Sequence, residues 1–200
     1  ASEHFCLSPL NSLHASLLPA YRGAAPANWA IANGETRTGL TTMQIDAGMD
    51  TGPIVLQREM EIAPGETAPE LLARMAEAGA PLVVETLRGL ERGEMRPRAQ
   101  DGSKASLAPL LKKEDGRIDW SLSAQQIYNR MRGFAPWPGA YTSFRGQTCQ
   151  VWGRQAEGAP GRMAEPGTLM TAGDKLLVAC GEGSWLRVEA VQVEGRKRVG

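Results

Sequence analysis

Two segments in the first quarter of the chain carry side chains that can hold or move a proton. One is His-Ala-Ser-Leu-Leu-Pro at residues 14–19, and the other is Asp-Ala-Gly-Met-Asp-Thr-Gly at residues 46–52. A histidine titrates near neutral pH, and a neighbouring carboxylate favours its charged form and fixes the ring orientation. Glycine and proline place both segments at bends of the backbone. The residue types therefore indicate acid–base chemistry by His14 and Asp50.

The elements between His14 and Asp50 are suited to bringing the two side chains together. Pro26 and the Asn-Gly pair at 33–34 are typical of the start and end of a short helix, and the β-branched residues of 39–45 predict a strand. In a parallel α/β sheet, sites form at the carboxyl ends of neighbouring strands. One helix and one strand are enough to return the chain beside its start, so we expect the side chains to meet. From the residues alone, a structural histidine that caps the turn remains the alternative.

The other segments of the first half predict elements that pack around this sheet. Residues 9–14 are typical of a short buried parallel strand, and the alternation in 53–62 predicts a strand near an edge. A capping box at 67–70 opens a run of apolar residues at helical spacing that ends at Gly93. Gly-Ala-Pro at 79–81 is expected to break or kink this run into two helices.

After residue 93 the pattern changes. Residues 94–118 are polar and without periodicity, which predicts a linker. A short helix is expected from the N-cap Ser123, with Gln126 completing a capping box, to Gly133. Arg-Gly at 145–146 predicts a hairpin turn. The strand-like segments, which together predict a small sandwich or barrel, are 140–144, 147–154, 175–180 and 185–193.

Composition indicates a globular protein. Hydrophobic residues make up 42% and charged residues 22% of the chain, unlike a disordered or fibrous protein. No apolar run approaches the roughly 20 residues that span a bilayer, so no membrane partner is expected. The three cysteines show no metal-ligand spacing, and their odd count favours a reducing compartment, the cytoplasm. Two aspartates in one loop fall short of a calcium site, so no metal is expected.

The net charge of zero divides unevenly along the chain. Residues 1–111 carry 9 Lys or Arg and 13 Asp or Glu, a net charge of −4, and residues 112–200 carry 13 and 9, a net charge of +4. The second part is therefore the better candidate for meeting a polyanion. A surplus of this size is also ordinary for a solvated surface, so charge alone leaves both interpretations open.

Several motifs together resemble those of the methionyl-tRNA formyltransferases, a branch of the formyltetrahydrofolate-dependent formyltransferases. In the first half these are His-x-Ser-Leu-Leu-Pro at 14–19, Tyr-Arg-Gly-Ala-Ala-Pro at 21–26 and Asp-x-Gly-x-Asp-Thr-Gly at 46–52. In the second half they are Arg-Ile-Asp-Trp at 117–120, Phe-Ala-Pro-Trp-Pro-Gly-Ala at 134–140 and Gln-Val-Trp at 150–152. Of the first set, the shorter core of His-x-Ser-Leu-Leu-Pro and Asp-x-Gly-x-Asp-x-Gly is shared across the wider group, whereas the second set is what favours this branch.

The resemblance implies an α/β fold in two parts. Residues 1–95 are expected to be the C-terminal half of a Rossmann-like formyltransferase domain, with 96–111 as a linker and 112–200 as a small OB-like β-barrel domain. Members of the family carry the other half of the Rossmann-like domain upstream of the histidine, so we expect an N-terminal portion to be missing here.

The resemblance also implies which residues act. His14 and Asp50 match the family's catalytic pair, and the turn formed by Ser16, Leu17, Leu18 and Pro19 matches its folate-contacting segment. The family's third catalytic residue, an asparagine two positions before the histidine, is Ser12 here, and Asn11 stands one position earlier. Strand alternation points Asn11 away from the side that His14 uses. Ser12 acting as the donor, a bulge that re-aims Asn11, and an unusual sequence start are the open explanations.

The implied reaction moves a formyl group from 10-formyltetrahydrofolate to the amino group of methionyl-initiator tRNA, in the cytoplasm and by a monomer. Basic residues that suit tRNA phosphates are Lys112, Lys113, Arg196, Lys197 and Arg198. Two other functions stay open: formyl transfer to a sugar nucleotide, and an inactive fragment that only binds tRNA.

Overall fold

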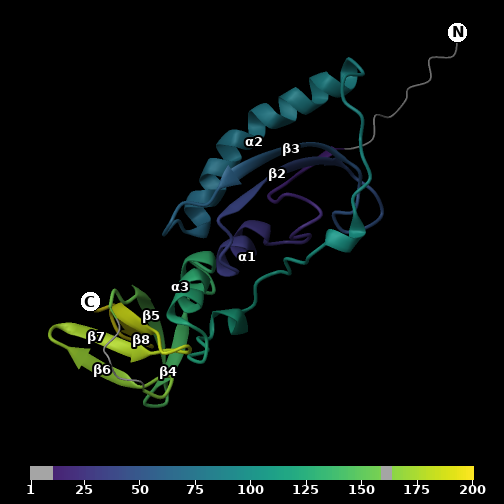
Figure 1. The fold of residues 1–200 in the computed structure, drawn as a ribbon. Coiled ribbons are helices and arrows are strands. Elements are labelled where there is room, and N and C mark those ends of the chain that lie inside the picture. The colour runs from purple at the N-terminus through teal and green to yellow at the C-terminus, as the bar shows by residue number, and fades with distance from the viewer. Residues whose placement is uncertain (1–10, 159–163) are drawn as a thin grey trace, which may run out of the picture. The chain divides into compact units, whose positions relative to one another are not determined.

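The computed structural model describes residues 11–158 and 164–200, which form two compact units (Figure 1). The first unit comprises the residues up to Ala27, Thr36–Ala63 and Glu70–Leu110. The second comprises Asn28–Glu35, Pro64–Pro69 and Leu111–Gly200. The finer division at 1–95, 96–111 and 112–200 stays a prediction.

The first unit is built on a three-stranded antiparallel sheet in the order β1-β2-β3. Its strands are β1 Asn11–His14, β2 Arg37–Gln44 and β3 Ile54–Glu61. The prediction of parallel strands is therefore wrong. Parallel neighbours need a crossover of a dozen or more residues, usually a helix packed on the sheet. The loop between β2 and β3 is too short for one, and most of the helix between β1 and β2, α1 (Pro26–Ala32), belongs to the second unit.

The two faces of this sheet have different coverings. His14 pairs with Thr41 and Ser12 with Met43, so these residues share one face, while Leu13 pairs with Thr42 on the opposite face. That opposite face lies under α2 (Ala68–Glu91), whose Thr86 hydroxyl lies 2.9 Å from that of Thr42. The face carrying His14 is left to the loops that follow β1 and β2.

Helix α2 runs unbroken through Pro81, so the predicted break at 79–81 is wrong. Proline removes one backbone hydrogen bond to the carbonyl four residues earlier. Here both Pro81 and Glu77 are exposed, so water can satisfy the carbonyl that loses its partner. The buried side chains of Met75 and Leu82 on either side keep the helix on the sheet.

The polar segment 94–118, predicted only as a linker, is fixed by backbone hydrogen bonds. Ile54 N donates to Arg98 O and Arg98 N donates to Ile54 O, both at 2.8 Å. The segment also holds two short 3-10 helices, Gly102–Lys104 and Lys113–Gly116. Hydrogen bonds of single residues leave no periodic trace in a sequence, which is why composition predicts a linker here.

The second unit contains a five-stranded antiparallel sheet in the order β4-β5-β8-β7-β6. The strands are β4 Tyr141–Phe144, β5 Gln147–Gln155, β6 Leu169–Ala172, β7 Lys175–Ala179 and β8 Trp185–Val193. The four predicted strands are confirmed, and β6 is an addition. Arg145 and Gly146 have φ of 51° and 78°, the geometry of a tight hairpin turn. Among the described strands no pairing joins β4 to β6, so no closed barrel is formed.

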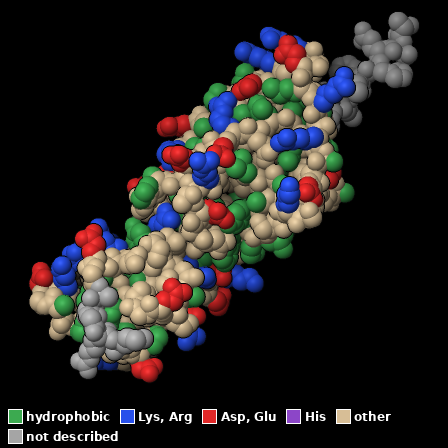
Figure 2. Space-filling model, viewed as in Figure 1, with side chains coloured by type: hydrophobic (Ala, Val, Ile, Leu, Met, Phe, Trp, Pro, Cys, Tyr) green, Lys and Arg blue, Asp and Glu red, His purple; other side chains and the backbone are tan. Residues whose placement is uncertain are grey.

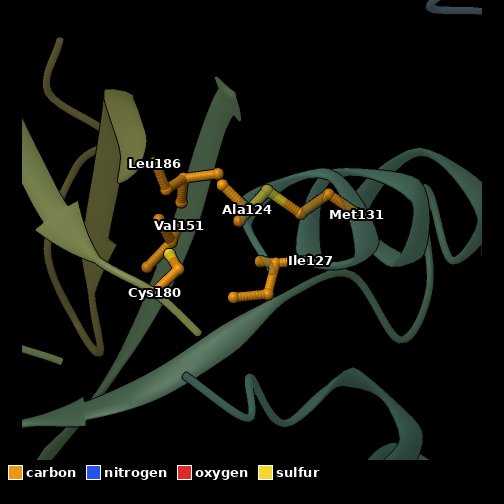
Figure 3. Close-up of a cluster of buried hydrophobic side chains, with 6 residues drawn as sticks. All are labelled: Ala124, Ile127, Met131, Val151, Cys180 and Leu186. Atoms are coloured by element: carbon orange, nitrogen blue, oxygen red, sulfur yellow. The ribbon is translucent and has the colours of Figure 1, made fainter. Parts of the chain in front are cut away.

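Helix α3 (Ala124–Gly133) packs its apolar side on this sheet. Ser123 caps it, and the Gln126 side chain accepts a hydrogen bond from Ser123 N at 2.9 Å, which confirms the predicted capping box. Figure 3 shows the side chains of the helix pointing toward those of the strands and loop. The members of this core are Ala124, Ile127, Met131, Val151, Cys180 and Leu186.

Burial raises the pKa of the Cys180 thiol from 9.0 to about 11. The unfolded chain therefore loses this proton at a lower pH than the folded chain. We expect its contribution to the free energy of unfolding to be complete below pH 9 and to disappear as the pH rises to about 11. Urea unfolding on both sides of this range checks the prediction, and Cys180→Val should lack this part of the pH dependence. If the free energy of unfolding falls equally with pH in the wild type and in Cys180→Val, the prediction is contradicted.

Candidate active site

His14 ends β1 with its ring between two oxygen acceptors. Nε2 lies 3.0 Å from the Tyr21 carbonyl oxygen, and Nδ1 lies 3.6 Å from Asp50 Oδ2. Because a carbonyl only accepts, Nε2 carries a proton, and a ring protonated on both nitrogens offers an N–H to each partner. His14 is 8% exposed. The predicted meeting of His14 and Asp50 is therefore confirmed, although the sheet that achieves it is antiparallel.

Asp50 is fixed by its backbone as well as by its side chain. Its Oδ2 accepts a hydrogen bond from Gly23 N at 2.8 Å, so one carboxylate oxygen faces both the imidazole and an amide. Asp50 and Tyr21 have φ of 54° and 60°, a left-handed conformation that costs an ordinary residue about 1–2 kcal/mol. Contacts with other residues must therefore keep Asp50 and Tyr21, which face the two ring nitrogens of His14, in this backbone conformation.

Asp46, the other aspartate of this loop, has a different task. Its Oδ1 accepts hydrogen bonds from Gly48 N at 3.0 Å and from the Thr51 hydroxyl at 2.7 Å. These bonds close a local turn that leads to Asp50. Asp46 therefore shapes the loop, while Asp50 faces the histidine.

The Ser-Leu-Leu-Pro turn is tied to β2 through a buried hydroxyl. Thr41 donates to Ser16 O at 2.6 Å and accepts from Leu18 N at 3.1 Å. Gln57 Nε2 donates to both Leu18 O and the Thr41 hydroxyl, each at 2.9 Å. The side chains of Ser16 and Leu18 are 0% and 3% exposed, whereas Leu17 and Pro19 are half-buried. Of these four residues, only Leu17 and Pro19 are open to a ligand in this conformation.

The structure separates Ser12 from Asn11. Ser12 lies on the face of β1 that carries His14, and Asn11 lies on the face toward α2. The register of β1 against β2 runs without a shift from Asn11 to His14, so the explanation by a bulge that re-aims Asn11 is wrong. Asn11 Oδ1 is buried without a hydrogen-bond partner among the described residues. Of the two candidates, Ser12 is the one on the site's side of the sheet.

Sequence reasoning missed the segment that holds the loop after the Ser-Leu-Leu-Pro turn. Arg22 N donates to Ser106 O at 2.8 Å, and Ala108 N donates to Arg22 O at 2.7 Å. A β-carbon on Gly23 would lie 2.5 Å from Ala108 O, so glycine is needed for this close approach. The one sequence signal for this contact was the Arg-Gly pair of the motif at 21–26. The segment that it contacts, which contains Ser106 and Ala108, was predicted only as a linker.

Gly52 is where the Asp50 loop rejoins the sheet, and it has no room for a side chain. A β-carbon there would lie 1.7 Å from Gln44 O. We expect Gly52→Ala to lower the free energy of unfolding by about 1–3 kcal/mol because the loop must shift. Gly102→Ala, where nothing lies within 4 Å, should change stability by less than about 0.5 kcal/mol. Urea denaturation of both variants is the measurement. If both variants are equally stable, the lack of space at Gly52 is contradicted.

The second unit contains a cavity of about 230 Å³ beside its basic C-terminal residues. Among its lining side chains, the Arg198 guanidinium lies 4.1 Å from the centre of the Trp152 ring. Arg132, 9% exposed, donates to Asn129 Oδ1 and to Glu66 O, and burial lowers the pKa of its guanidinium. On the face drawn in Figure 2, basic and acidic side chains are interspersed.

The described residues contain no group of three or more His, Cys, Asp or Glu side chains arranged to hold a metal ion. Nor is any helix in the described ranges both long and apolar enough to cross a membrane.

Two family models match most of the sequence: "Formyl transferase" over residues 3–87 and "Formyl transferase, C-terminal domain" over residues 110–200. The chain belongs to the formyl transferase family. The resemblance inferred from the motifs is thereby confirmed, and with it the α/β fold class. The histidine motif, the aspartate loop and their contacts lie in the region matched by the first model.

Named relatives cover a large share of this chain. A methionyl-tRNA formyltransferase of Solibacter usitatus is 56% identical over 195 residues, which are 96% of this chain and 62% of the relative. One of Acidobacterium capsulatum is 54% identical over 188 residues, 94% of this chain and 60% of the relative. The chain thus spans about three fifths of the length of these relatives.

Among solved structures, HypX from Aquifex aeolicus in complex with tetrahydrofolic acid is similar in fold. The TM-score is 0.65 with 18% sequence identity, covering 94% of this chain and 33% of HypX.

Proposed function

We propose that this chain carries the catalytic pair of an enzyme that transfers a formyl group from 10-formyltetrahydrofolate to the amino group of methionyl-initiator tRNA. The observation that carries the proposal is the contact of His14 Nδ1 with Asp50 Oδ2 at 3.6 Å in the family's matched motifs. The names of the relatives support the acceptor. The same proposal places the protein in the cytoplasm as a monomer.

The geometry suggests how the pair works. The amine attacks the formyl carbon, its N–H bond breaks as the new C–N bond is completed, and the departing folate nitrogen takes up a proton. His14 exchanges protons with these nitrogens, while Asp50 orients the ring and balances its charge. The side chain of Asp50 is 21% exposed and that of His14 9%, so the carboxylate is the partner nearer to solvent.

Charge also develops on the formyl oxygen during attack, and a hydrogen-bond donor would stabilise it. Ser12, on the same strand face as His14, is our candidate donor in place of the family's asparagine. A hydroxyl on a shorter side chain reaches less far than an amide. Removing one such donor from an active site typically costs about 10²–10³-fold in rate. Because Ser12→Asn restores the longer donor, we expect this substitution to raise the turnover of the chimera rather than lower it.

The folate is proposed to lie along the Ser-Leu-Leu-Pro turn. Leu17 and Pro19 offer half-buried apolar surface, which suits one face of a flat pterin ring. Ser16 and Leu18 shape the turn from inside through their contacts with Thr41 and Ala20. They therefore contribute to the folate site by position rather than by direct side-chain contact.

The tRNA is proposed to meet the basic residues of the second unit. Arg198 extends over the Trp152 ring at the cavity described above, where its side chain is exposed. The other basic residues proposed to contact phosphates are Lys112, Lys113, Arg196 and Lys197. Trp152 is half-buried and serves here as a platform for the arginine.

A chimera tests the proposed activity. This chain replaces the matching residues of the Solibacter usitatus relative, and formyl transfer is measured with charged initiator tRNA and, separately, with an amino-sugar nucleotide. We expect transfer to the tRNA. Transfer only to the sugar would favour the sugar-nucleotide alternative. In parallel, the 200-residue chain is titrated with folate and with tRNA, and RNA binding without folate binding would favour the inactive module.

A further inference from the structure

The side-chain amide of Gln100 joins the two loops that flank His14. Its Oε1 accepts hydrogen bonds from Arg22 Nε at 3.1 Å and Arg22 Nη2 at 2.6 Å. Its Nε2 donates to Asp50 O at 2.8 Å and to Gly52 O at 2.7 Å. The amide has two donor hydrogens and two acceptor lone pairs, and all four are used.

These partners are the points where the two loops need support. Asp50 has a left-handed backbone, and Gln100 holds the carbonyl of that residue and the carbonyl of Gly52. Arg22 precedes Gly23, whose amide donates to the Asp50 carboxylate. Gln100 therefore holds the backbone of Asp50 through its Nε2. Through Arg22 it also holds the segment that contains Gly23, whose amide donates to the Asp50 carboxylate. It does this without contacting His14 itself.

We propose that Gln100 is a positioning residue that holds the Asp50 carboxylate against His14. The expected effect on turnover rests on the proposed function, whereas the expected effect on the position of Asp50 rests on the hydrogen bonds described above. Its side chain is half-buried and hydrogen-bonded on both ends of the amide. A residue that served only to fill space would not need both ends of an amide.

The Gly23 amide gives a spectroscopic readout, because its proton points at Asp50 Oδ2. In ¹H–¹⁵N spectra of the 200-residue chain, Gln100→Leu should shift this resonance toward its position in Asp50→Ala, which removes the acceptor of the Gly23 amide. Amide exchange at Gly23 should rise by about tenfold or more, a loss comparable to one net hydrogen bond. In the double variant with Asp50→Ala, Gln100→Leu should cause no further shift, because the acceptor is already absent. Amides of β2 that stay protected show that the chain remains folded.

Two further variants separate positioning from general stability. Gln100→Glu keeps acceptors for Arg22 but faces two carbonyl oxygens with a carboxylate, so it should move the Gly23 resonance as Gln100→Leu does. Gln57→Leu removes an amide of the same unit that binds Leu18 O and Thr41 instead, and it should leave the Gly23 resonance in place. An unmoved resonance in both Gln100 variants, or an equal shift in Gln57→Leu, would overturn the proposal.

Kinetics of the chimera link this position to turnover. We expect Gln100→Leu to lower kcat by about 10–100-fold, since small misplacements of reacting groups are costly, with KM for folate within about twofold. A raised KM with unchanged kcat would overturn the role in positioning the pair. The spectra need neither folate nor transfer, so a failure of the proposed activity would leave the Gly23 result to decide this inference by itself.

Discussion

Replacing His14 with Ala is expected to lower formyl transfer by the chimera by about 10²–10⁴-fold, the usual contribution of a general acid–base residue. The ring contacts both the Asp50 carboxylate and the Tyr21 carbonyl. Its loss removes the proton carrier and leaves the Asp50 carboxylate without the imidazole that it faces. Single-turnover rates at saturating folate and tRNA measure the effect on chemistry rather than on binding.

His14→Gln is the matched control for the loss of a hydrogen bond. A glutamine side chain can donate to the Tyr21 carbonyl but does not titrate near neutral pH. We therefore expect His14→Gln to be as slow as His14→Ala while retaining more stability toward urea. Turnover near the wild-type rate in His14→Gln would contradict a role of the imidazole in proton transfer.

Asp50→Asn is the second substitution with a large expected effect, about 10²-fold or more on the single-turnover rate. Asparagine tolerates the left-handed backbone at this position, and its carbonyl can still accept from Gly23. The substitution therefore removes the charge that balances the imidazolium with little change of shape. Circular dichroism and urea unfolding should show a protein close to the wild type.

Asp46→Asn makes the same chemical change in the same loop. Asp46 bonds Gly48 and Thr51 and does not contact His14, so we expect a loss of less than about tenfold, as for a group without a direct part in proton transfer. Equal losses in the two variants would mean that the shape of the loop, and not the charge at Asp50, supports transfer. That outcome would contradict the assigned role of Asp50.

Local patterns predicted most elements of the fold because those patterns record burial. Alternation located β3, a capping box located α3 at Ser123, and the turn residues at 145–146 located the β4–β5 hairpin. Strand direction leaves no such pattern, so the parallel arrangement of the first sheet was wrongly predicted. His14 and Asp50 still meet because the loops after β1 and β2 lie on the same face of the sheet.

Other features depend on partners that are distant in sequence. Gln100 and Ser106 lie in a polar segment that resembles a linker, yet they hold Arg22 and Tyr21 of the loop that follows β1. Pro81 breaks a helix by local rules, but here the affected carbonyl lies on the exposed side. Such single contacts have no period along the chain, and only the folded structure reveals them.

The most direct test of the central claim is a double-mutant cycle on single-turnover formyl transfer with His14→Ala, Asp50→Asn and the combined variant. If the imidazole and the carboxylate act as one unit, the combined variant should be about as slow as the slower single variant. If the two losses multiply instead, the residues act independently, and the pair is not the catalyst proposed here.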